Sequence, residues 1–502
     1  MAVGLAVLAL LGALSVAVVR ILTHYPFHDE CLHAHNLYLM SEGLAPHRDF
    51  WCNYPVAGYV LARPVLALAP ATAGTFLGLR FLMLVPILGA GWLLAVHGRR
   101  TAGGFLWGAA PFTLILVTPS PGRFLAEFSI DHLAMLPAVG AIVLAFARPR
   151  PLRAGAATAL ALVSVAITPK YGPALALGAA GLVLAGSIPP GRRRATLVAT
   201  VAGAAAAVVL VLGLYALSGT TPAENFRYSV ALMARFKLAT DAAPSPLALT
   251  VLTMLLRNLP LLLLVVLGLW GFGRAIREDG PFRHLGAIGV LLGTVASTLL
   301  LRTYMLQYVV PVLTALAAFA VFVPRRFRFR GRDLALSLVT LGAVGLGLKL
   351  ATDEFVRTPF NVRDPGGPVA RETVVMWKEP ATEMLAKVQA ILDRVPEDER
   401  FLASPQMGLI FRRGHTWLTA DENPSLAGLL PEDDPARRSF EPAQLRERLA
   451  DRAPAFLCLS ALEHNFPAGW REIVEEYLRR NRRFYVPVPG LPEAWLRADL
   501  AR

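Results

Sequence analysis

Long apolar segments separated by short polar loops run through the first 350 residues of the chain. The apolar runs fall at 1–22, 74–97, 102–118, 130–147, 154–168, 171–187, 195–217, 256–273, 285–301, 308–323 and 334–350. A helix needs about 17–25 residues to cross a bilayer, and most runs reach or approach that length once their flanks are included. The pattern predicts a polytopic α-helical membrane protein with about eleven transmembrane helices.

The run 56–70 differs from these because it is short and carries Arg63-Pro64 in its middle. An arginine at the bilayer centre costs about 2.5–3.5 kcal/mol or more, so we expect an interfacial helix here. With the N-terminus cytoplasmic, this choice puts five basic loops on the cytoplasmic side, as the positive-inside rule requires. These loops hold Arg99-Arg100, Arg148 to Arg153, Arg192 to Arg194, Arg274 to Arg283 and Arg325 to Arg332. Residues 352–502 are then extracytoplasmic.

The first run resembles a signal peptide only superficially. It is long enough to span, lacks a basic leading region, and has no clear small-residue cleavage site. We interpret it as a retained first transmembrane helix.

Composition and charge support the membrane assignment. Hydrophobic residues make up 55% and charged residues 17% of the chain, and the mean hydropathy is +0.51. Residues 1–351 carry 28 basic and 11 acidic side chains, whereas 352–502 carry 21 and 24. The basic excess therefore belongs to the loops between spans, and no nucleic-acid partner is expected even for the arginine- and phenylalanine-rich stretch 325–330.

Residues 352–502 differ in character from the rest of the chain. We predict helices at 380–394, 442–452 and 468–480, and strands near 400–404, 455–459 and 483–487. Helices that alternate with short apolar strands indicate a small α/β domain with a partly parallel sheet. The chain thus divides into a membrane domain, 1–351, and an extracytoplasmic α/β domain, 352–502, which we interpret as an acceptor-side or partner-binding module.

The acids of the membrane half map mainly to one face. Three of the eleven lie in cytoplasmic loops, and the other eight lie at the outer face or its boundary: Asp29, Glu30, Glu42, Asp49, Glu127, Asp131, Glu224 and Asp241. Proton relays and ion pathways place carboxylates within the spans. An external active site therefore explains this distribution better than a transport pathway does.

The first external loop, about residues 23–73, holds most of the candidate chemistry. Asp29-Glu30 follow the first span, and such a pair could hold a divalent cation or supply a general base. Nearby histidines allow a zinc site, because Asp29 and His33 are spaced i,i+4, but no established zinc spacing is present and polar packing is favoured. Cys31 and Cys52 could form a disulfide, although their spacing alone cannot establish the geometry.

The order of these motifs resembles that of GT-C membrane glycosyltransferases. A first span is followed by the acidic pair, a helix at 31–40, Gly43 to Trp51, and Tyr54-Pro55 opening an amphipathic stretch. The similarity is to the protein O-mannosyltransferase and lipid A aminoarabinose transferase branch. Three later segments, all at predicted outer span ends, continue it: Arg123 to His132, Thr168-Pro169-Lys170, and Arg302 to Pro311.

The resemblance implies transfer of a sugar from a polyprenyl-phosphate donor to a glycan, lipid or protein acceptor outside the cell's inner (plasma) membrane. Asp29 would be the general base, and Glu30, Asp49 or Asp131 would orient the acceptor or hold a divalent cation, Mg²⁺ or Mn²⁺. The donor phosphate needs cations, for which Lys170, Arg302 and Arg123 are the candidates. Asp49, Trp51, Tyr54 and Gln307 are expected to contact the sugar or acceptor.

Two other classes of function stay open at this point. A transporter or flippase of envelope glycolipids would show paired, broken helices in two halves. The stretch Arg257-Asn258-Leu-Pro260 is one such break without a counterpart. A non-catalytic subunit of an envelope-assembly complex would not depend on the Asp29 carboxylate.

Overall fold

The computed structural model describes most of the chain, with gaps. The described residues are 2–23, 28–50, 52–68, 73–189, 191–232, 247–301, 306–326, 331–357, 390–391, 393–396, 399–402, 431, 433–438, 441–459, 469–489 and 493–501. Of the predicted site residues, Trp51 and Arg302 lie outside the described residues, as does most of the predicted helix 380–394.

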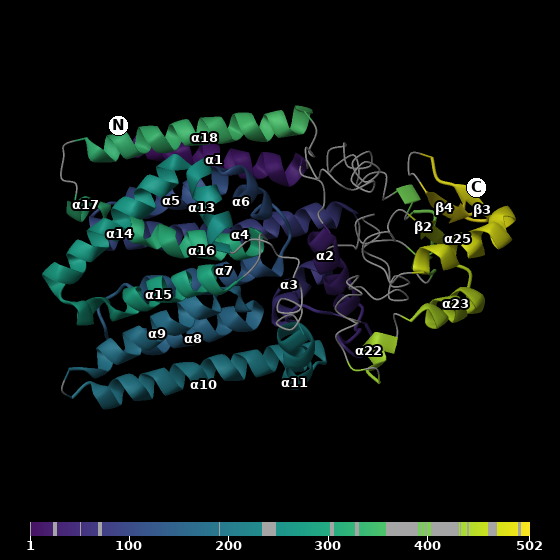
Figure 1. The fold of residues 1–502 in the computed structure, drawn as a ribbon, viewed down its shortest axis with the longest axis horizontal. Coiled ribbons are helices and arrows are strands. Elements are labelled where there is room, and N and C mark those ends of the chain that lie inside the picture. Colours follow the sequence, from purple (N-terminus) through teal and green to yellow (C-terminus); the bar gives the residue numbers. More distant parts are fainter. Residues whose placement is uncertain are drawn as a thin grey trace.

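A bundle of roughly parallel helices forms the larger part of the protein (Figure 1). Among the described residues, six helical segments are long and apolar enough to cross a membrane. They belong to α1 (Ala2–Thr23), α4 (Ala73–Ala102), α10 (Arg193–Ser218), α14 (Leu259–Asp279), α15 (Leu285–Leu300) and α18 (Arg332–Arg357). The protein is therefore a helical, multi-pass membrane protein.

Shorter apolar helices fill the spaces between the long ones. They are α5 (Leu106–Val117), α7 (Ile130–Ala145), α8 (Pro151–Ile167), α9 (Gly172–Ser187), α13 (Leu247–Arg257) and α16 (Leu306–Ala317), which continues as a 3₁₀ turn, Ala318–Phe322, and α17 (Val323–Arg326). Each of the eleven predicted apolar runs coincides with a helix, whereas α13 was not predicted as a separate element. The number of membrane crossings stays a prediction, because the shorter helices have at most 17 residues, the lower limit for crossing a bilayer.

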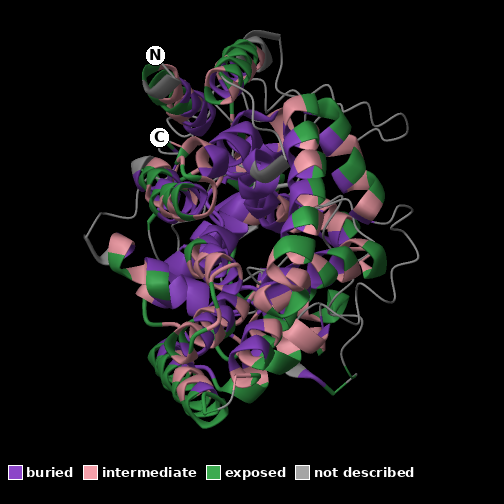
Figure 2. Cartoon of the chain, turned by 90° about the vertical axis from the view of Figure 1, so that its left-hand side faces the viewer, coloured by how far each residue is buried: buried purple, intermediate pink, exposed green. Residues whose placement is uncertain are grey.

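Large apolar side chains line the outside of the bundle as well as its core. Val201, Val209 and Leu217 on α10 are 67–70% exposed. Figure 2 shows buried residues concentrated at the centre and exposed residues on the outward faces of the helices. An apolar exterior of this kind suits contact with lipid rather than water.

Glycines allow neighbouring helices to approach closely. A Cβ placed on Gly108 of α5 would lie 1.7 Å from the carbonyl oxygen of Leu94 in α4. A Cβ on Gly289 of α15 would lie 2.0 Å from the carbonyl oxygen of Leu177 in α9. Because hydrocarbon offers no hydrophobic driving force between helices, such close packing supplies much of their attraction.

The break after α5 is held by side chains from two distant helices. Arg20 of α1 donates hydrogen bonds to the carbonyl oxygens of Leu116 (2.8 Å) and Val117 (3.1 Å). Asn258, which begins α14, donates to the carbonyl oxygen of Leu114 at 3.0 Å. Arg20 thus satisfies carbonyls that the end of a helix leaves without an intrahelical partner, whereas the Leu114 carbonyl also accepts from the Thr118 N–H. The chain then turns into α6 (Pro119–Phe124).

The basic loops gather at one end of the bundle. The charges of Arg100, Arg148 and Arg150 act on Arg153, and Trp107 Nε1 donates to Asp333 Oδ1 at 3.0 Å. In the same region the ring of His284 lies 6.1 Å from that of Phe322, and Gly155 of α8 approaches the backbone of Ala199 in α10. Loops that the sequence predicts on one side therefore lie together; that this side is cytoplasmic stays a prediction.

Short helices cover the opposite end of the bundle (Figure 1). They are α2 (His28–Ser41), α3 (Ala57–Leu68), α11 (Pro222–Asn225) and a single π-helical segment, Phe226–Ala231. α3 falls within the run 56–70 for which an interfacial helix is predicted, and its 12 residues span about 18 Å. That length is well short of the hydrocarbon core of about 30 Å, and α3 packs on α2, α7 and α10.

The C-terminal part contains a small mixed sheet. Its strands are β1 (Phe401–Leu402), β2 (Phe456–Cys458), β3 (Tyr485–Pro487) and β4 (Ala494–Arg497), in the order β1-β2-β4-β3. β1 and β2 are parallel, and β4 is antiparallel to both β2 and β3. β1, β2 and β3 fall at the predicted positions, as do α23 (Pro442–Asp451) and α25 (Trp470–Asn481), whereas β4 was not predicted.

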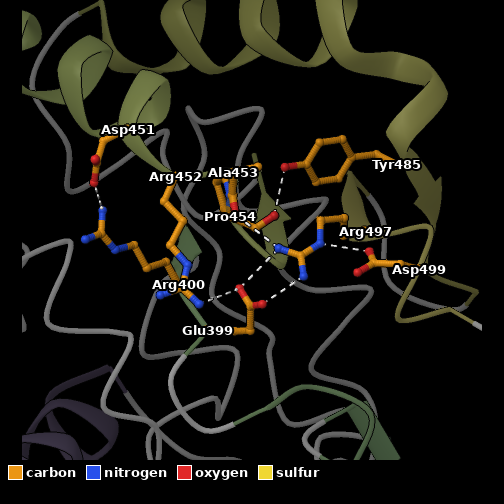
Figure 3. Close-up of polar contacts among 9 residues, drawn as sticks. All are labelled: Glu399, Arg400, Asp451, Arg452, Ala453, Pro454, Tyr485, Arg497 and Asp499. Atoms are coloured by element: carbon orange, nitrogen blue, oxygen red, sulfur yellow. Dashed lines mark hydrogen bonds and ion pairs between the residues drawn. The ribbon is translucent and has the colours of Figure 1, made fainter.

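An arginine–carboxylate network joins the end of β4 to the segment before β1 (Figure 3). Arg497 donates to both carboxylate oxygens of Glu399, at 2.8 and 3.1 Å, and to Asp499 at 2.8 Å. Arg452 adds a second cation 3.6 Å from Glu399. These bonds lower the pKa of the Asp499 carboxyl and raise that of Arg497.

Candidate functional site

Charged side chains inside the protein concentrate at the end of the bundle opposite the basic loops. They come from α2, α4, α6, the α6–α7 loop, α7, the 3₁₀ turn Pro169–Tyr171 and α16. We call this group the polar cluster: Asp29, Glu30, Arg80, Arg123, Glu127, Asp131, Lys170 and Gln307. Five of its members are predicted catalytic or phosphate-binding residues, and a sixth, Gln307, is a predicted sugar contact.

Lys170 ties together three separate helical segments. Its ammonium group donates hydrogen bonds to the Asp131 carboxylate and to the Gln307 side-chain oxygen. The Lys170 and Asp131 side chains are only 8% and 7% exposed. The ammonium also lies 5.3 Å from the centroid of the Tyr308 ring, within range of a cation–π interaction. Residues far apart in the sequence thus converge on one partly buried cation.

Local structure explains the position of Asp131. It occupies the first turn of α7, where a negative charge is favoured by the helix dipole. Its own backbone N–H donates to the Ser129 hydroxyl, which caps the helix, at 3.3 Å. Thr168, directly before the turn that carries Lys170, is buried close to this carboxylate.

Glu30 and Arg80 form a fully buried ion pair. Arg80 donates from Nε and Nη2 to the two Glu30 oxygens, each at 2.6 Å, and from Nη1 to the Ile21 carbonyl at 2.7 Å. Glu30 also accepts a hydrogen bond from the Phe128 N–H at 2.7 Å. Both side chains are 0% exposed. This geometry favours a structural role for Glu30, which links α1, α2, α4 and the α6–α7 loop, over the predicted catalytic or metal-binding role.

Asp29 is placed differently from its neighbour. It lies in the first turn of α2 and is partly exposed. Among the residues that the structure describes, no hydrogen bond or ion pair to its carboxylate is found. Its charge nevertheless acts on Glu127 and on Tyr308, so it borders the polar cluster. A carboxylate in this position can accept a proton from a ligand without first breaking an ion pair.

Glu127 adds a second acid beside the Glu30–Arg80 pair. Burial raises the pKa of its carboxyl well above the usual value, and the charge of Glu30 raises it further. The positive charges of Arg80 and Arg123 oppose this effect. Glu127 can therefore hold its proton under conditions in which ordinary carboxyl groups are ionised.

Aromatic and imidazole rings form one wall beside the cluster. His33 Nδ1 lies 2.7 Å from the Tyr59 hydroxyl, and Asn36 Nδ2 donates to the same oxygen at 3.2 Å. The Tyr54 ring meets His33 edge-on, with centroids 4.4 Å apart. His33 is also close enough to Asp131 for their charges to interact. Tyr54, a predicted sugar-binding residue, is thus part of this wall.

Asp49 and the surrounding turn lie outside this centre. The Asp49 carboxylate accepts from Arg48 Nη2 at 3.0 Å and from the Ala45 N–H at 2.8 Å, and these bonds lower its pKa. Its predicted contact with an acceptor stays a prediction. The neighbouring His47 is stacked on Tyr228 with ring centroids 5.0 Å apart, and burial lowers the His47 pKa to about 4.

The structure also bears on the metal and disulfide hypotheses. Cys31 and Cys52 are both buried free thiols and are not bridged. Within the described part of the chain, no three His, Cys, Asp or Glu side chains are grouped closely enough to hold a metal ion. A metal site that includes a described carboxylate such as Asp29 would need further ligands from residues outside the described ranges or from the substrate.

Two members of the cluster were not predicted as site residues: Glu127, which was noted only as an acid of the outer face, and Arg80. Arg80 lies inside the predicted span 74–97, where an arginine is costly unless it is paired. The cost of an unpaired arginine within a span indicates that Arg80 has an acidic partner. That partner could have been sought among the acids near the ends of other spans, such as Glu30. Compared with known proteins, the chain matches no protein-family model, no curated protein and no solved structure.

Proposed function

We propose that this protein is a membrane glycosyltransferase that moves a sugar from a polyprenyl-phosphate donor to an extracytoplasmic acceptor. The observation that carries the proposal is the position of Asp29, a carboxylate without a described partner, beside the Asp131–Lys170–Gln307 group. This combination lies at the end of the bundle opposite the basic loops, where the GT-C resemblance expects a donor site.

The proposed reaction is a direct displacement at the anomeric carbon. Asp29 takes a proton from an acceptor hydroxyl or amine, and the resulting nucleophile forms a bond to the anomeric carbon. The bond between that carbon and the phosphate oxygen breaks, and polyprenyl phosphate leaves with the electron pair. A positioned general base contributes about 10²–10⁴-fold to such a step.

The leaving phosphate needs positive charge close to the membrane surface. Lys170 is the candidate with described geometry, and Arg123 and Arg302 are proposed as further donors to the phosphate. A lysine ammonium has three N–H donors, of which Asp131 and Gln307 accept two. The remaining donor can meet a phosphate oxygen while the ion pair with Asp131 persists.

We also propose that Asp29 would help substrate oxygens to hold a divalent cation, Mg²⁺ or Mn²⁺, which would supply further positive charge for the leaving phosphate. Carboxylate and phosphate oxygens are the ligands that these ions prefer. Glu30 is not included, because both of its oxygens are engaged by Arg80.

Replacement of Asp29 by Asn tests the proposal. With purified protein in detergent and a panel of polyprenyl-phosphate sugars, Asp29→Asn should lower transfer about 10²-fold or more. Glu42→Gln is the matched control, because Glu42 is an exposed acid just beyond the end of α2. Gel filtration of each variant verifies folding, and full transfer by a folded Asp29→Asn protein would refute the assignment.

The same proteins separate this function from the transporter and assembly-subunit hypotheses. In sealed vesicles, a glycosyltransferase makes a covalent product only when the donor is on one side. A transporter would move the glycolipid without forming that product, and an assembly subunit would tolerate Asp29→Asn in the cell.

A further inference from the structure

A groove opens on the outer surface of the bundle, away from the polar cluster. It has a volume of about 680 Å³ and is formed by α8, α9 and α10, which lie side by side along one flank of the bundle (Figure 1). Its wall includes the small side chains Ala161, Ala176, Ala179 and Ala180. Because small residues occupy these positions, three packed helices leave a channel between them instead of a continuous ridge.

Apart from Thr158 and Thr200, whose hydroxyls donate to carbonyls of their own helices, the lining of the groove is apolar except near the basic end of the bundle. There, Ser187, which ends α9, and Arg193, which begins α10, join it. Arg193 is exposed and belongs to the run Arg192-Arg193-Arg194. The groove therefore combines a hydrocarbon-lined channel with a guanidinium group at the expected level of the lipid headgroups.

We propose that this groove binds one anionic glycerophospholipid, with an acyl chain between α8, α9 and α10 and the headgroup phosphate on Arg193. The surrounding bilayer is as apolar as the channel, so acyl-chain burial alone gives little preference for one lipid over another. Preference must come from the headgroup, and basic pockets between transmembrane helices favour anionic lipids. Arginine suits this role because its planar guanidinium can donate two parallel hydrogen bonds to a phosphate.

The location distinguishes this site from the proposed sugar-donor site. Lys170 and Asp131 lie at the outer end of α8 and α7, whereas Arg193 lies at the basic end of α10. The inference therefore does not depend on the proposed glycosyltransferase activity. It assigns a lipid-binding role to a surface that the reaction does not use.

The test is native mass spectrometry of the full chain in detergent, titrated with the anionic lipid POPG or the zwitterionic lipid POPC. Wild-type protein should retain POPG in preference to POPC. Arg193→Gln should weaken POPG retention about fivefold, the effect expected for one arginine contact at a membrane surface. Ala180→Leu should also lower retention, because Ala180 is exposed in the groove and a larger side chain would fill the channel.

Arg194→Gln is the matched control. Arg194 is the next residue, is also exposed, and does not line the groove. Its replacement changes the net charge equally and should alter POPG retention by less than about twofold. Equal losses for Arg193→Gln and Arg194→Gln would show diffuse electrostatic attraction and would overturn the site. Equal retention of POPG and POPC by the wild-type protein, or no effect of Ala180→Leu, would overturn it as well.

Discussion

The buried ion pair between Glu30 and Arg80 should be one of the most sensitive points of the fold. Arg80 uses three N–H donors, two on Glu30 and one on the Ile21 carbonyl. Replacement of Arg80 by Met would leave the Glu30 carboxylate buried without its cation. Asp29 and Glu127 lie in the same region, and the charges of Glu30 and Asp29 already raise the pKa of the Glu127 carboxyl.

The magnitude follows from the loss of one partner of a buried pair. Such a change costs about 3–5 kcal/mol, because the remaining charge is uncompensated. With an unfolding entropy of about 2.1 cal/mol/K per residue over roughly 350 residues, the melting temperature should fall by about 4–7 °C. Glu30→Leu combined with Arg80→Met should recover much of this loss, because well-packed apolar residues can replace a buried ion pair.

Thermal unfolding of the full chain in detergent, followed by tryptophan fluorescence, measures these differences. Arg63→Met is the control, because Arg63 is a part-exposed arginine of α3 outside the pair. The reasoning fails if Arg80→Met melts at the wild-type temperature. It also fails if the double variant is as unstable as Arg80→Met alone, since the penalty would then not come from the unpaired carboxylate.

Three further predictions concern other contacts. Because the pKa of the Glu127 carboxyl is raised in the folded protein, the folded state keeps this proton at pH values at which the unfolded chain has lost it, and the free energy of unfolding should fall as pH rises through that range. Glu127→Gln removes the titrating group, so it should raise the melting temperature more at pH 8 than at pH 5. Equal effects at the two pH values would contradict this. The Asp434 side chain is 1% exposed and accepts a hydrogen bond from the half-exposed Arg227 at 2.7 Å. Asp434→Asn should lower local stability by about 1 kcal/mol and speed amide hydrogen exchange of residues 433–438 about fivefold. Unchanged exchange would be evidence against the contact. Gly108→Ala would clash with a backbone carbonyl and should cost about 1–3 kcal/mol, whereas Gly104→Ala, with only ordinary contacts at 3.5 Å, should be tolerated.

Apolar periodicity was sufficient to predict the helices of the bundle. Each predicted run coincides with a helix because a membrane-embedded backbone must satisfy its hydrogen bonds within one segment. The run 256–273 was extended too far back, since Asn258 caps α14 and separates it from α13. A local side-chain hydrogen bond, to the Leu261 N–H at 3.1 Å, thus decides a boundary that hydropathy does not show.

The pairings within the polar cluster could not be predicted in the same way. The placement of Asp131, Lys170 and Gln307 at one end of the bundle follows from span order, but which donor meets which acceptor depends on helix rotation and packing. β4 was missed for a related reason. Its four residues follow a turn, and their strand conformation depends on pairing with β2 and β3, which lie about 40 and 10 residues earlier in the chain.

The two ion pairs of the polar cluster, Glu30–Arg80 and Asp131–Lys170, differ in how fully their hydrogen-bonding groups are used. Glu30 has every oxygen engaged by Arg80 and a backbone N–H, so it cannot take a proton without disrupting contacts among four segments. Lys170, in contrast, keeps one N–H donor beyond those directed at Asp131 and Gln307. An arriving phosphate would therefore add to the Lys170–Asp131 pair and be oriented by it, while Asp29, at the edge of the cluster, would keep its carboxylate for the acceptor. The proposed chemistry needs only the third Lys170 N–H and the Asp29 carboxylate. The buried Glu30–Arg80 pair holds together the helices that carry these groups.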